Sequence, residues 1–329
     1  MQFNKAFDDF TARKAGILGE LGLVCIVGSV AYGTNIPGKS DLDIRGWAFG
    51  SLDTLLGYKG DFEQLEDKTS DIVLYSLKKY IRLLVNNNPN CLESLGLNEE
   101  FYLFKSPAME ELMANLDRII SSKISQTIGG YARQQLGRLQ SLNRKGDAIE
   151  SVAIDTTHTV LTDRLKRDII VRVTNRRDDW HEEGELRAEL LTDISGLTLK
   201  EVSDVTERMK ILTLNYNKLD ARNRKVDEAH MNKHAMHICR LLLFGSDILK
   251  TGQVRTCMTQ DHDLLMSIRN GEFQEPNGLY GEKFDKLVAE CEKRFGEAKA
   301  TTKLRSEPDM EWINKFQVRV LKEKVMEMI

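Results

Sequence analysis

The pattern of apolar residues near the N-terminus changes from helical to strand spacing. Four apolar side chains fit one face of an amphipathic helix over residues 1–20, namely Phe3, Phe7, Phe10 and Ile17. The continuous apolar run Leu23–Val27 then predicts a buried strand that ends in a tight turn at a Gly-Ser pair. A second strand is predicted where Asp-Leu-Asp-Ile alternates polar and apolar residues from Asp41 to Ile44.

The remaining pattern divides the chain into a strand-rich and a helix-rich part. Up to residue 105 it predicts an extension of the second strand to residue 49, a helical turn over 51–56, a third strand over 70–76 and a helix over 77–86. Beyond that point helical periodicity dominates, over 108–121, 126–144, 227–242, 261–270 and 280–329. The predicted fold class is α+β, with a small mixed-sheet domain (residues 1–105) followed by a mostly α-helical domain (residues 106–329).

Composition limits the function classes. The 329 residues carry a net charge of −3, so any nucleic acid binding must come from a local basic patch. The five cysteines form no Cys-x-x-Cys pair, which fits neither a zinc site nor a disulfide framework and favours a reducing cytoplasm. The sequence shows neither a signal-peptide arrangement nor an apolar run of membrane-spanning length, so no membrane partner is expected.

The residues around the first turn carry candidate chemistry. Strand alternation predicts that Asp41 and Asp43 lie on one face, where two carboxylates repel each other unless a cation compensates them. A divalent ion held by carboxylates and substrate phosphates is the usual solution, which indicates Mg²⁺, with Mn²⁺ as an alternative. Gly28 allows the backbone to approach a phosphate closely, and Ser29 offers a hydroxyl and an N–H. The alternative without a metal site is a hairpin with an exposed acidic strand.

Taken together, Gly28-Ser29-Val30-Ala31-Tyr32-Gly33-Thr34 and Ser40-Asp41-Leu42-Asp43 resemble the DNA polymerase β superfamily of nucleotidyltransferases. The longer pattern is similar to one branch, the RNA-repair-pathway nucleotidyltransferases. This resemblance implies transfer of a nucleotide from an NTP to an acceptor hydroxyl, with release of pyrophosphate. It also implies that Asp41 and Asp43 are catalytic metal ligands, and that Gly28, Ser29, Thr34 and Ser40 contact the nucleotide.

The superfamily usually has a third acid on the strand after the paired acids. Asp71, at the start of the run Ser70–Ser76, is the best-placed candidate for a catalytic and metal-binding carboxylate. Glu63 and Glu66 are rival positions, and an Asp that merely begins a strand in solvent is the simpler alternative.

Basic residues of the helical part complete the candidate site. Lys233, His237 and Arg240 share one helical face, and such a ridge suits a triphosphate. Arg133 and Arg138 give an earlier helix a basic bias, so they are candidate acceptor-binding residues, although a solvated helix face explains them equally well. Both stretches resemble the same family.

Three functions remain open at this stage. The first is an enzyme that adds a nucleotide to an RNA (tRNA-like) 3′ end. The second is a nucleotidyltransferase that modifies a protein or a small molecule. The third is a non-catalytic nucleotide- or nucleic-acid-binding protein, which the paired acids disfavour. The sequence does not indicate an oligomeric state.

Overall fold

The structure is a computed structural model that describes residues 5–38, 40–146, 155–160, 169–176, 185–190, 195–207, 209–210, 228–257 and 259–329. The chain divides into two compact units, residues 1–139 together with 232–329, and residues 140–231. Among the described residues, no helix combines the length and apolar character needed to cross a membrane.

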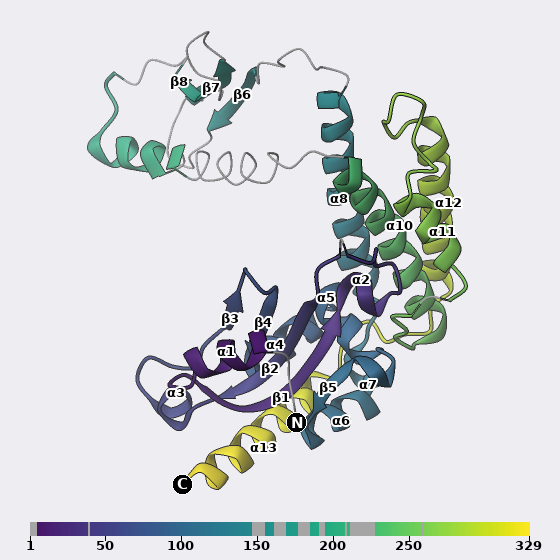
Figure 1. Cartoon of the computed structure of the whole chain (residues 1–329). Coiled ribbons are helices and arrows are strands. Elements are labelled where there is room, and N and C mark those ends of the chain that lie inside the picture. Colours follow the sequence, from purple (N-terminus) through teal and green to yellow (C-terminus); the bar gives the residue numbers. More distant parts are fainter. Residues whose placement is uncertain are drawn as a thin grey trace. The chain divides into compact units, whose positions relative to one another are not determined.

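A mixed five-stranded sheet forms the strand-rich part of the first unit (Figure 1). Its strands lie in the order β3-β4-β2-β1-β5 and comprise β1 (Leu18–Val27), β2 (Asp43–Gly50), β3 (Gln64–Asp67), β4 (Ile72–Ser76) and β5 (Tyr102–Lys105). Only the β2–β4 pair is parallel, and β1 pairs antiparallel with both β2 and β5. The predicted α+β class with a mixed N-terminal sheet is confirmed.

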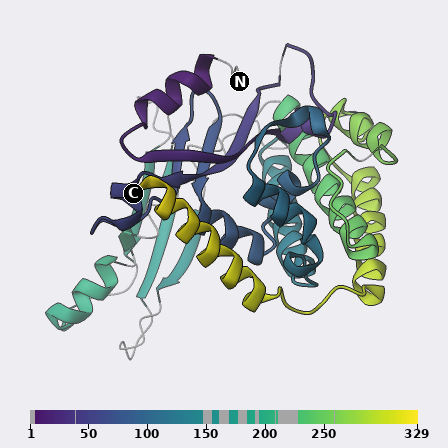
Figure 2. The same ribbon diagram turned by 90° about the horizontal axis from the view of Figure 1, so that it is seen from below.

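The two faces of the sheet are covered by helices from opposite ends of the chain. On one face, α1 (Lys5–Arg13) packs Phe7 and Phe10 against Ile44 and neighbouring strand residues. The other face carries the fully buried Trp47, whose ring stacks on Tyr80 of α4 (Leu77–Val85). The C-terminal α13 (Met310–Met328) lies on this second side, so α1 and α13 flank the sheet (Figure 2). Aromatic burial on both faces gives the sheet a two-sided core.

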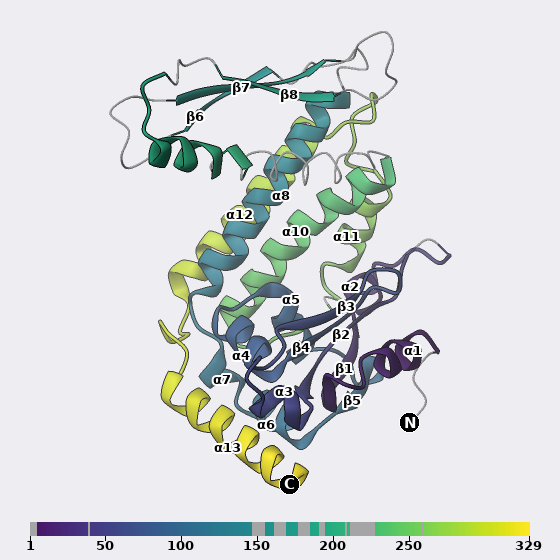
Figure 3. The ribbon, with the colours of Figure 1, turned by 90° about the vertical axis from the view of Figure 1, so that its left-hand side faces the viewer.

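Helices make up the rest of the first unit. Short ones follow the strands, namely α2 (Gly28–Ala31), α3 (Leu52–Leu56), α5 (Pro89–Leu92), α6 (Pro107–Ala114), α7 (Leu116–Ile119) and the 3₁₀ turns η1 (Glu93–Leu95) and η2 (Glu99–Phe101). The longer ones are α8 (Ile124–Gly146), α10 (Glu228–Thr251), α11 (His262–Arg269) and α12 (Glu282–Thr301). Helices α8, α10 and α12 lie side by side (Figure 3).

A glycine contact fixes the close approach of these three helices. A Cβ atom on Gly245 of α10 would lie 2.6 Å from the Phe295 ring of α12 and 3.0 Å from Ile128 of α8. Gly129 of α8 also borders Phe295, at 3.3 Å, whereas a Cβ on Gly130 would meet nothing within 4 Å. The missing side chain at Gly245 therefore lets Phe295 fill the space between the helices.

The second unit contains a three-stranded antiparallel sheet in the order β6-β7-β8. Its strands are β6 (Asp155–Val160), β7 (Ile169–Arg176) and β8 (Glu185–Leu190). The sequence pattern did not predict these strands, because residues 147–215 show no clear alternation of apolar and polar positions. The chain after residue 105 is therefore mainly, but not wholly, helical.

Three sequence-based boundaries differ from the structure. Helix α1 ends at Arg13, and the segment up to residue 20, predicted as helix, instead turns into β1. Strand β2 begins at Asp43, so Asp41 lies outside it and strand alternation does not set its face. The strand-rich part does end at residue 105, but later helices belong to the same compact unit. A separate domain over residues 1–105 stays a prediction.

We expect opposite effects from two Gly→Ala changes in neighbouring helices. Gly130→Ala raises the free energy of unfolding by roughly 1 kcal/mol, because alanine favours the helix and the site is open. Gly245→Ala lowers it, since overpacking against Phe295 costs about 1–3 kcal/mol and exceeds the gain in helix propensity. Urea unfolding of both variants measures the difference. Equal stabilisation by both changes would contradict the packing argument.

Candidate active site

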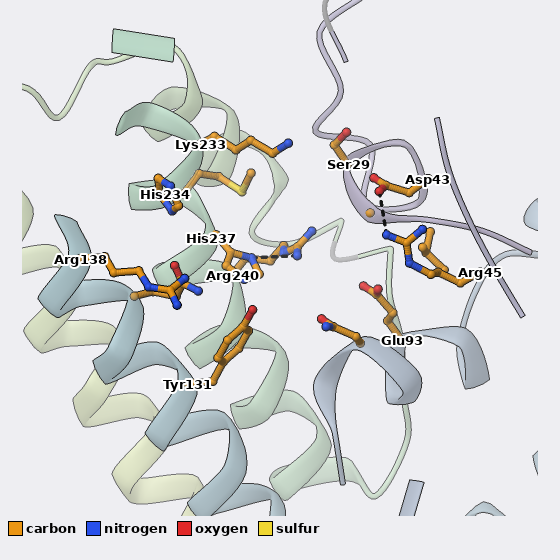
Figure 4. A pocket seen from close by; sticks show the side chains of 15 residues that line it. Ser29, Asp43, Arg45, Glu93, Tyr131, Arg138, Lys233, His234, His237 and Arg240 are labelled. Carbon is orange, nitrogen blue, oxygen red and sulfur yellow. Dashed lines mark hydrogen bonds and ion pairs between the residues drawn. The ribbon is translucent and has the colours of Figure 1, made fainter. Parts of the chain in front are cut away.

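A cavity of about 370 Å³ lies within the first unit, where the end of β1 faces α8 and α10 (Figure 4). It is lined by Val27, Gly28, Ser29, Asp43, Arg45, Asn90, Glu93, Tyr131, Gln135, Arg138, Lys233, His234, Met236, His237 and Arg240. Segments separated by almost 200 residues in the sequence thus share one concave site, as is typical of a ligand pocket.

The corner formed by β1 and β2 holds the carboxylate of Asp43. Val27 pairs with Asp43 across the two strands, and Gly28 follows with φ +68°. A Cβ atom on Gly28 would lie 2.3 Å from Asp43 Oδ2, so this position requires glycine both for its backbone conformation and for space. Arg45 forms an ion pair with Asp43 over 3.3 Å.

Asp43 is partly buried and has charged neighbours of both signs. Burial raises the pKa of its carboxyl group, Asp71 and Asp41 add to this shift, and Arg45 and Lys233 oppose it. Parallel pairing of Ile44 with Ile72 explains the proximity of Asp71, since each acid directly precedes one of these paired residues. A partly buried carboxyl group beside two further acids favours binding of a cation.

Glu93 contributes a second, more deeply buried carboxyl group to the cavity wall. It lies in η1, is 7% exposed, and burial raises its pKa to about 7. Arg240 and Arg45 oppose this shift, whereas Asp43 increases it. A side-chain hydrogen bond with Tyr32 links Glu93 to the turn that follows α2.

The α10 wall carries the cations. The Arg240 guanidinium lies 3.8 Å from the centre of the Tyr32 ring, a cation–π contact, and its Nη2 donates to His237 Nδ1 over 2.9 Å. Burial and the neighbouring Arg240 hold the pKa of His237 well below its usual value. Because Nδ1 accepts from arginine, neutral His237 carries its proton on Nε2. Lys233 is exposed on the same helical face and points toward Ser29 and Asp43 (Figure 4).

The α8 wall presents Tyr131, Gln135 and Arg138, which recur at i, i+4 and i+7 along the helix. The Tyr131 ring packs edge-on against His237, with ring centres 5.8 Å apart. Gln135 is almost fully buried, at 3% exposure. This wall therefore combines an aromatic ring, an amide and one cation.

The structure gathers about half of the sequence-predicted site residues at the cavity. Those that line it are Gly28, Ser29, Asp43, Lys233, His237, Arg240 and Arg138. Those that do not line it are Asp41, Asp71, Thr34, Ser40 and Arg133. Thr34 is fully buried with its N–H on the Ser29 carbonyl, and the Ser40 hydroxyl accepts from the Ile36 N–H. Both thus stabilise the turn locally, and their proposed nucleotide contacts stay predictions.

The three candidates for the third acid differ in position. The Asp71 backbone, at φ 49°, accepts from Ile44 N–H and from the Arg45 guanidinium, and its charge acts on Asp43. Glu63 is exposed and pairs with Lys79 and Arg82, while Glu66 is exposed on β3. Asp71 is therefore the closest of the three to Asp43.

Sequence reasoning did not assign several residues of the cavity, namely Arg45, Asn90, Glu93, Tyr131, Gln135, His234 and Met236. For two of them the sequence contained a usable signal. Arg45 alternates with Asp43 along the strand, and Gln135 lies between Tyr131 and Arg138 on one helical face. Nothing local in the sequence marks Glu93 as a cavity residue, because its position depends on how η1 packs.

The donor chemistry at this corner fits a hard divalent ion. Carboxylate oxygens of Asp43 and of the nearby Asp41 and Asp71 are the ligand type that Mg²⁺ takes, completed by phosphate oxygens and water. Within the described part of the chain, no group of three His, Cys, Asp or Glu side chains already converges on a metal position. The acids alone thus do not form a closed cage, in keeping with a metal shared with a substrate.

We expect replacement of Glu93 by glutamine to stabilise the protein only at higher pH. Its folded-state pKa of about 7 exceeds the usual value of 4.5, so the folded protein binds more protons between these values and loses stability as the pH rises. Glu93→Gln removes this loss, which by linkage amounts to roughly 3 kcal/mol at pH 8 and little at pH 5.

Urea unfolding at both pH values measures this difference. The matched control is Glu100→Gln at an exposed position of η2, for which no such pH-dependent gain is expected. A pH-independent effect of Glu93→Gln would contradict the assigned buried carboxyl.

Comparison with protein families gave one match. Residues 4–158 match the model described as RlaP: RNA repair pathway DNA polymerase beta family. Comparison with curated proteins and with solved structures gave no match. The matched segment contains the Gly28–Asp43 corner, Glu93 and the α8 wall, whereas the cations of α10 lie outside it. Residues 4–158 are therefore similar to the RNA repair pathway DNA polymerase beta family.

Proposed function

We propose that this protein is a divalent-metal-dependent nucleotidyltransferase that transfers an NMP from an NTP to the 3′ hydroxyl of an RNA. The single observation that carries the proposal is the cavity in which Asp43 and Ser29 face the α10 cations. It joins the family's acidic corner to a ridge of positive charge of the kind a triphosphate requires.

Different residues of the cavity bind the phosphate groups of the NTP. Lys233 and Arg240 neutralise phosphate oxygens, and His237 donates from Nε2. Gly28 and Ser29 lie at the opposite wall, where the glycine allows close approach of a phosphate and the serine donates to it. Such a clamp aligns the α-phosphorus with the attacking hydroxyl, and this alignment supplies much of the catalysis.

Asp41, Asp43 and Asp71 are the proposed holders of Mg²⁺, with Mn²⁺ as an alternative. When bound, the ion neutralises charge that develops on phosphate oxygens and activates the attacking oxygen. The raised pKa of Asp43, caused first by burial and opposed by Arg45, supports the need for a further cation at this corner. Asp41, exposed just before β2, is free to rotate toward such an ion.

The choice of an RNA acceptor rests on the family description and on α8. Arg138 lines the cavity and Arg133 is exposed on the same helix, which supports both as candidates for contact with a phosphate backbone near the site. A protein or small-molecule acceptor needs no such arginines. It is the alternative that the RNA-binding experiment below distinguishes.

We expect Asp43→Asn and Asp41→Asn to abolish transfer while leaving the fold intact. Removal of a metal ligand takes away several kcal/mol of charge stabilisation, which corresponds to at least about a hundredfold lower rate. Incorporation of label from α-³²P NTPs into total RNA, with Mg²⁺ present, measures the rate. Asp53→Asn in α3, exposed and outside the cavity, is the matched control. Full activity in both site variants would overturn the catalytic assignment.

We expect an Arg133→Ala, Arg138→Ala double variant to bind RNA more weakly than wild type. Each arginine that no longer pairs with a phosphate makes the slope of log affinity against log salt shallower by roughly 0.7 for single strands. Fluorescence anisotropy at about 50 and 200 mM salt measures both quantities. The control double variant is Arg255→Ala, Arg319→Ala, which removes two surface arginines paired with Asp247 and Glu111. RNA binding that is absent, or unaffected by the site variant, would favour the protein or small-molecule acceptor.

A further inference from the structure

Gln135 is a buried amide in the wall of the cavity. Its side chain is 3% exposed, and its Oε1 has no hydrogen-bond partner within the described part of the chain. A buried acceptor without a partner destabilises a fold unless a ligand or an ordered water completes it. The terminal torsion of a glutamine side chain is broad, so a small rotation presents this oxygen to a bound molecule.

The surroundings of Gln135 differ from the phosphate-binding part of the cavity. Lys233 and Arg240 project from α10 toward the acidic corner (Figure 4), whereas Tyr131 and Gln135 belong to α8. Tyr131 is half-buried and directs its ring toward the cavity. An aromatic ring beside an amide is the combination that proteins use to stack a base and to read its polar edge.

The polarity of the unpaired atom selects between bases. An acceptor oxygen pairs with the exocyclic amino group of adenine or cytosine, and the adjacent N–H₂ group pairs with the neighbouring ring nitrogen. Guanine and uracil present a carbonyl oxygen at the same position, which repels Oε1. We propose that Gln135 is a specificity-determining residue that makes the cavity prefer a nucleotide whose base carries an amino group at the 6-position of a purine or the 4-position of a pyrimidine.

This inference rests on the proposed function only in requiring that the cavity binds a nucleoside triphosphate. It adds the substrate class, which neither the family match nor the acidic corner determines. ATP and CTP share the recognised chemistry, and the experiment distinguishes them. An ordered water on Oε1, with no role in recognition, is the competing explanation.

The test compares nucleotides that differ in one polar group. Dissociation constants of the α,β-methylene analogues of ATP and ITP are measured by calorimetry, because adenine and hypoxanthine differ at the 6-amino position. A CTP and UTP pair tests the pyrimidines. For wild type we expect the amino-bearing base of at least one pair to bind about 10- to 100-fold more tightly, as for a two-point amide contact.

Two substitutions and a neighbouring control separate recognition from structure. Gln135→Met keeps the volume and should bring the ratio of the two constants close to one, with thermal stability unchanged or raised. Gln135→Glu keeps an acceptor oxygen but loses the N–H₂ group, so the preference for the amino base should become smaller without reversing. Gln134→Met, at the exposed neighbour on α8, should leave the ratio as in wild type.

The outcomes separate the two proposals. Equal affinities within both pairs in wild type, no nucleotide binding at all, or an unchanged ratio in Gln135→Met would overturn the inference. Reversal of the preference in a folded Gln135→Glu variant would also overturn it. A preference that depends on Gln135 in a protein without transfer activity would support the inference and refute the proposed function. Transfer activity without any base preference would support the proposed function and refute the inference.

Discussion

The half-buried carboxylate of Asp43 lies where β1 and β2 meet side by side, and the local structure is arranged to hold it there. Gly28 leaves room for Oδ2, and Arg45 pairs with Oδ1 while donating to the backbone carbonyl groups of Ile44 and Asp71. A single guanidinium thus fixes the acid and joins the starts of β2 and β4. Partial burial makes this charge costly, so its neighbours must supply compensation.

Part of that compensation comes from a distant part of the sequence, because Lys233 of α10 acts together with Arg45 to oppose the raised pKa of Asp43. Arg240 is almost 200 residues from Asp43, yet it acts on the same buried carboxyl, Glu93, as Arg45 does. Its guanidinium is oriented by the Tyr32 ring and by His237, and Tyr32 in turn belongs to the turn after Gly28. Acidic corner and basic helix therefore position each other through a continuous set of polar and aromatic contacts. Residues 140–231 interrupt the sequence between α8 and α10, the two helices that carry the rest of the cavity wall.

The sequence was sufficient to predict those elements and site residues that depend on local residue patterns. Periodicity located β1, β2 and β4 together with α4, α8 and α11 but not the short strands β3 and β5, and the Gly-Ser and Asp-x-Asp pattern located the corner. It extended α1 too far, because Ile17 fits helical spacing but belongs to the turn before β1. It could not find Glu93, whose burial results from the packing of η1 against β1. Sequence analysis also failed to assign Tyr131 and Gln135 to the site. Helical periodicity indicates which residues share a face of the helix, but not which other elements that face contacts.

Two polar atoms of the cavity wall, Arg240 Nε and Gln135 Oε1, have no hydrogen-bond partner within the described part of the chain, so packing and stability alone do not explain this site. Each costs roughly 1–3 kcal/mol if it stays unsatisfied, and apolar side chains of similar shape would avoid that cost. The two atoms are of opposite type, because Nε–H is a donor and Oε1 an acceptor. The proposed nucleotide substrate carries groups of both matching types, with acceptor oxygens on its phosphates and a donor on an amino-bearing base. Under the proposed function, a bound substrate therefore offers a partner of the right type to each atom.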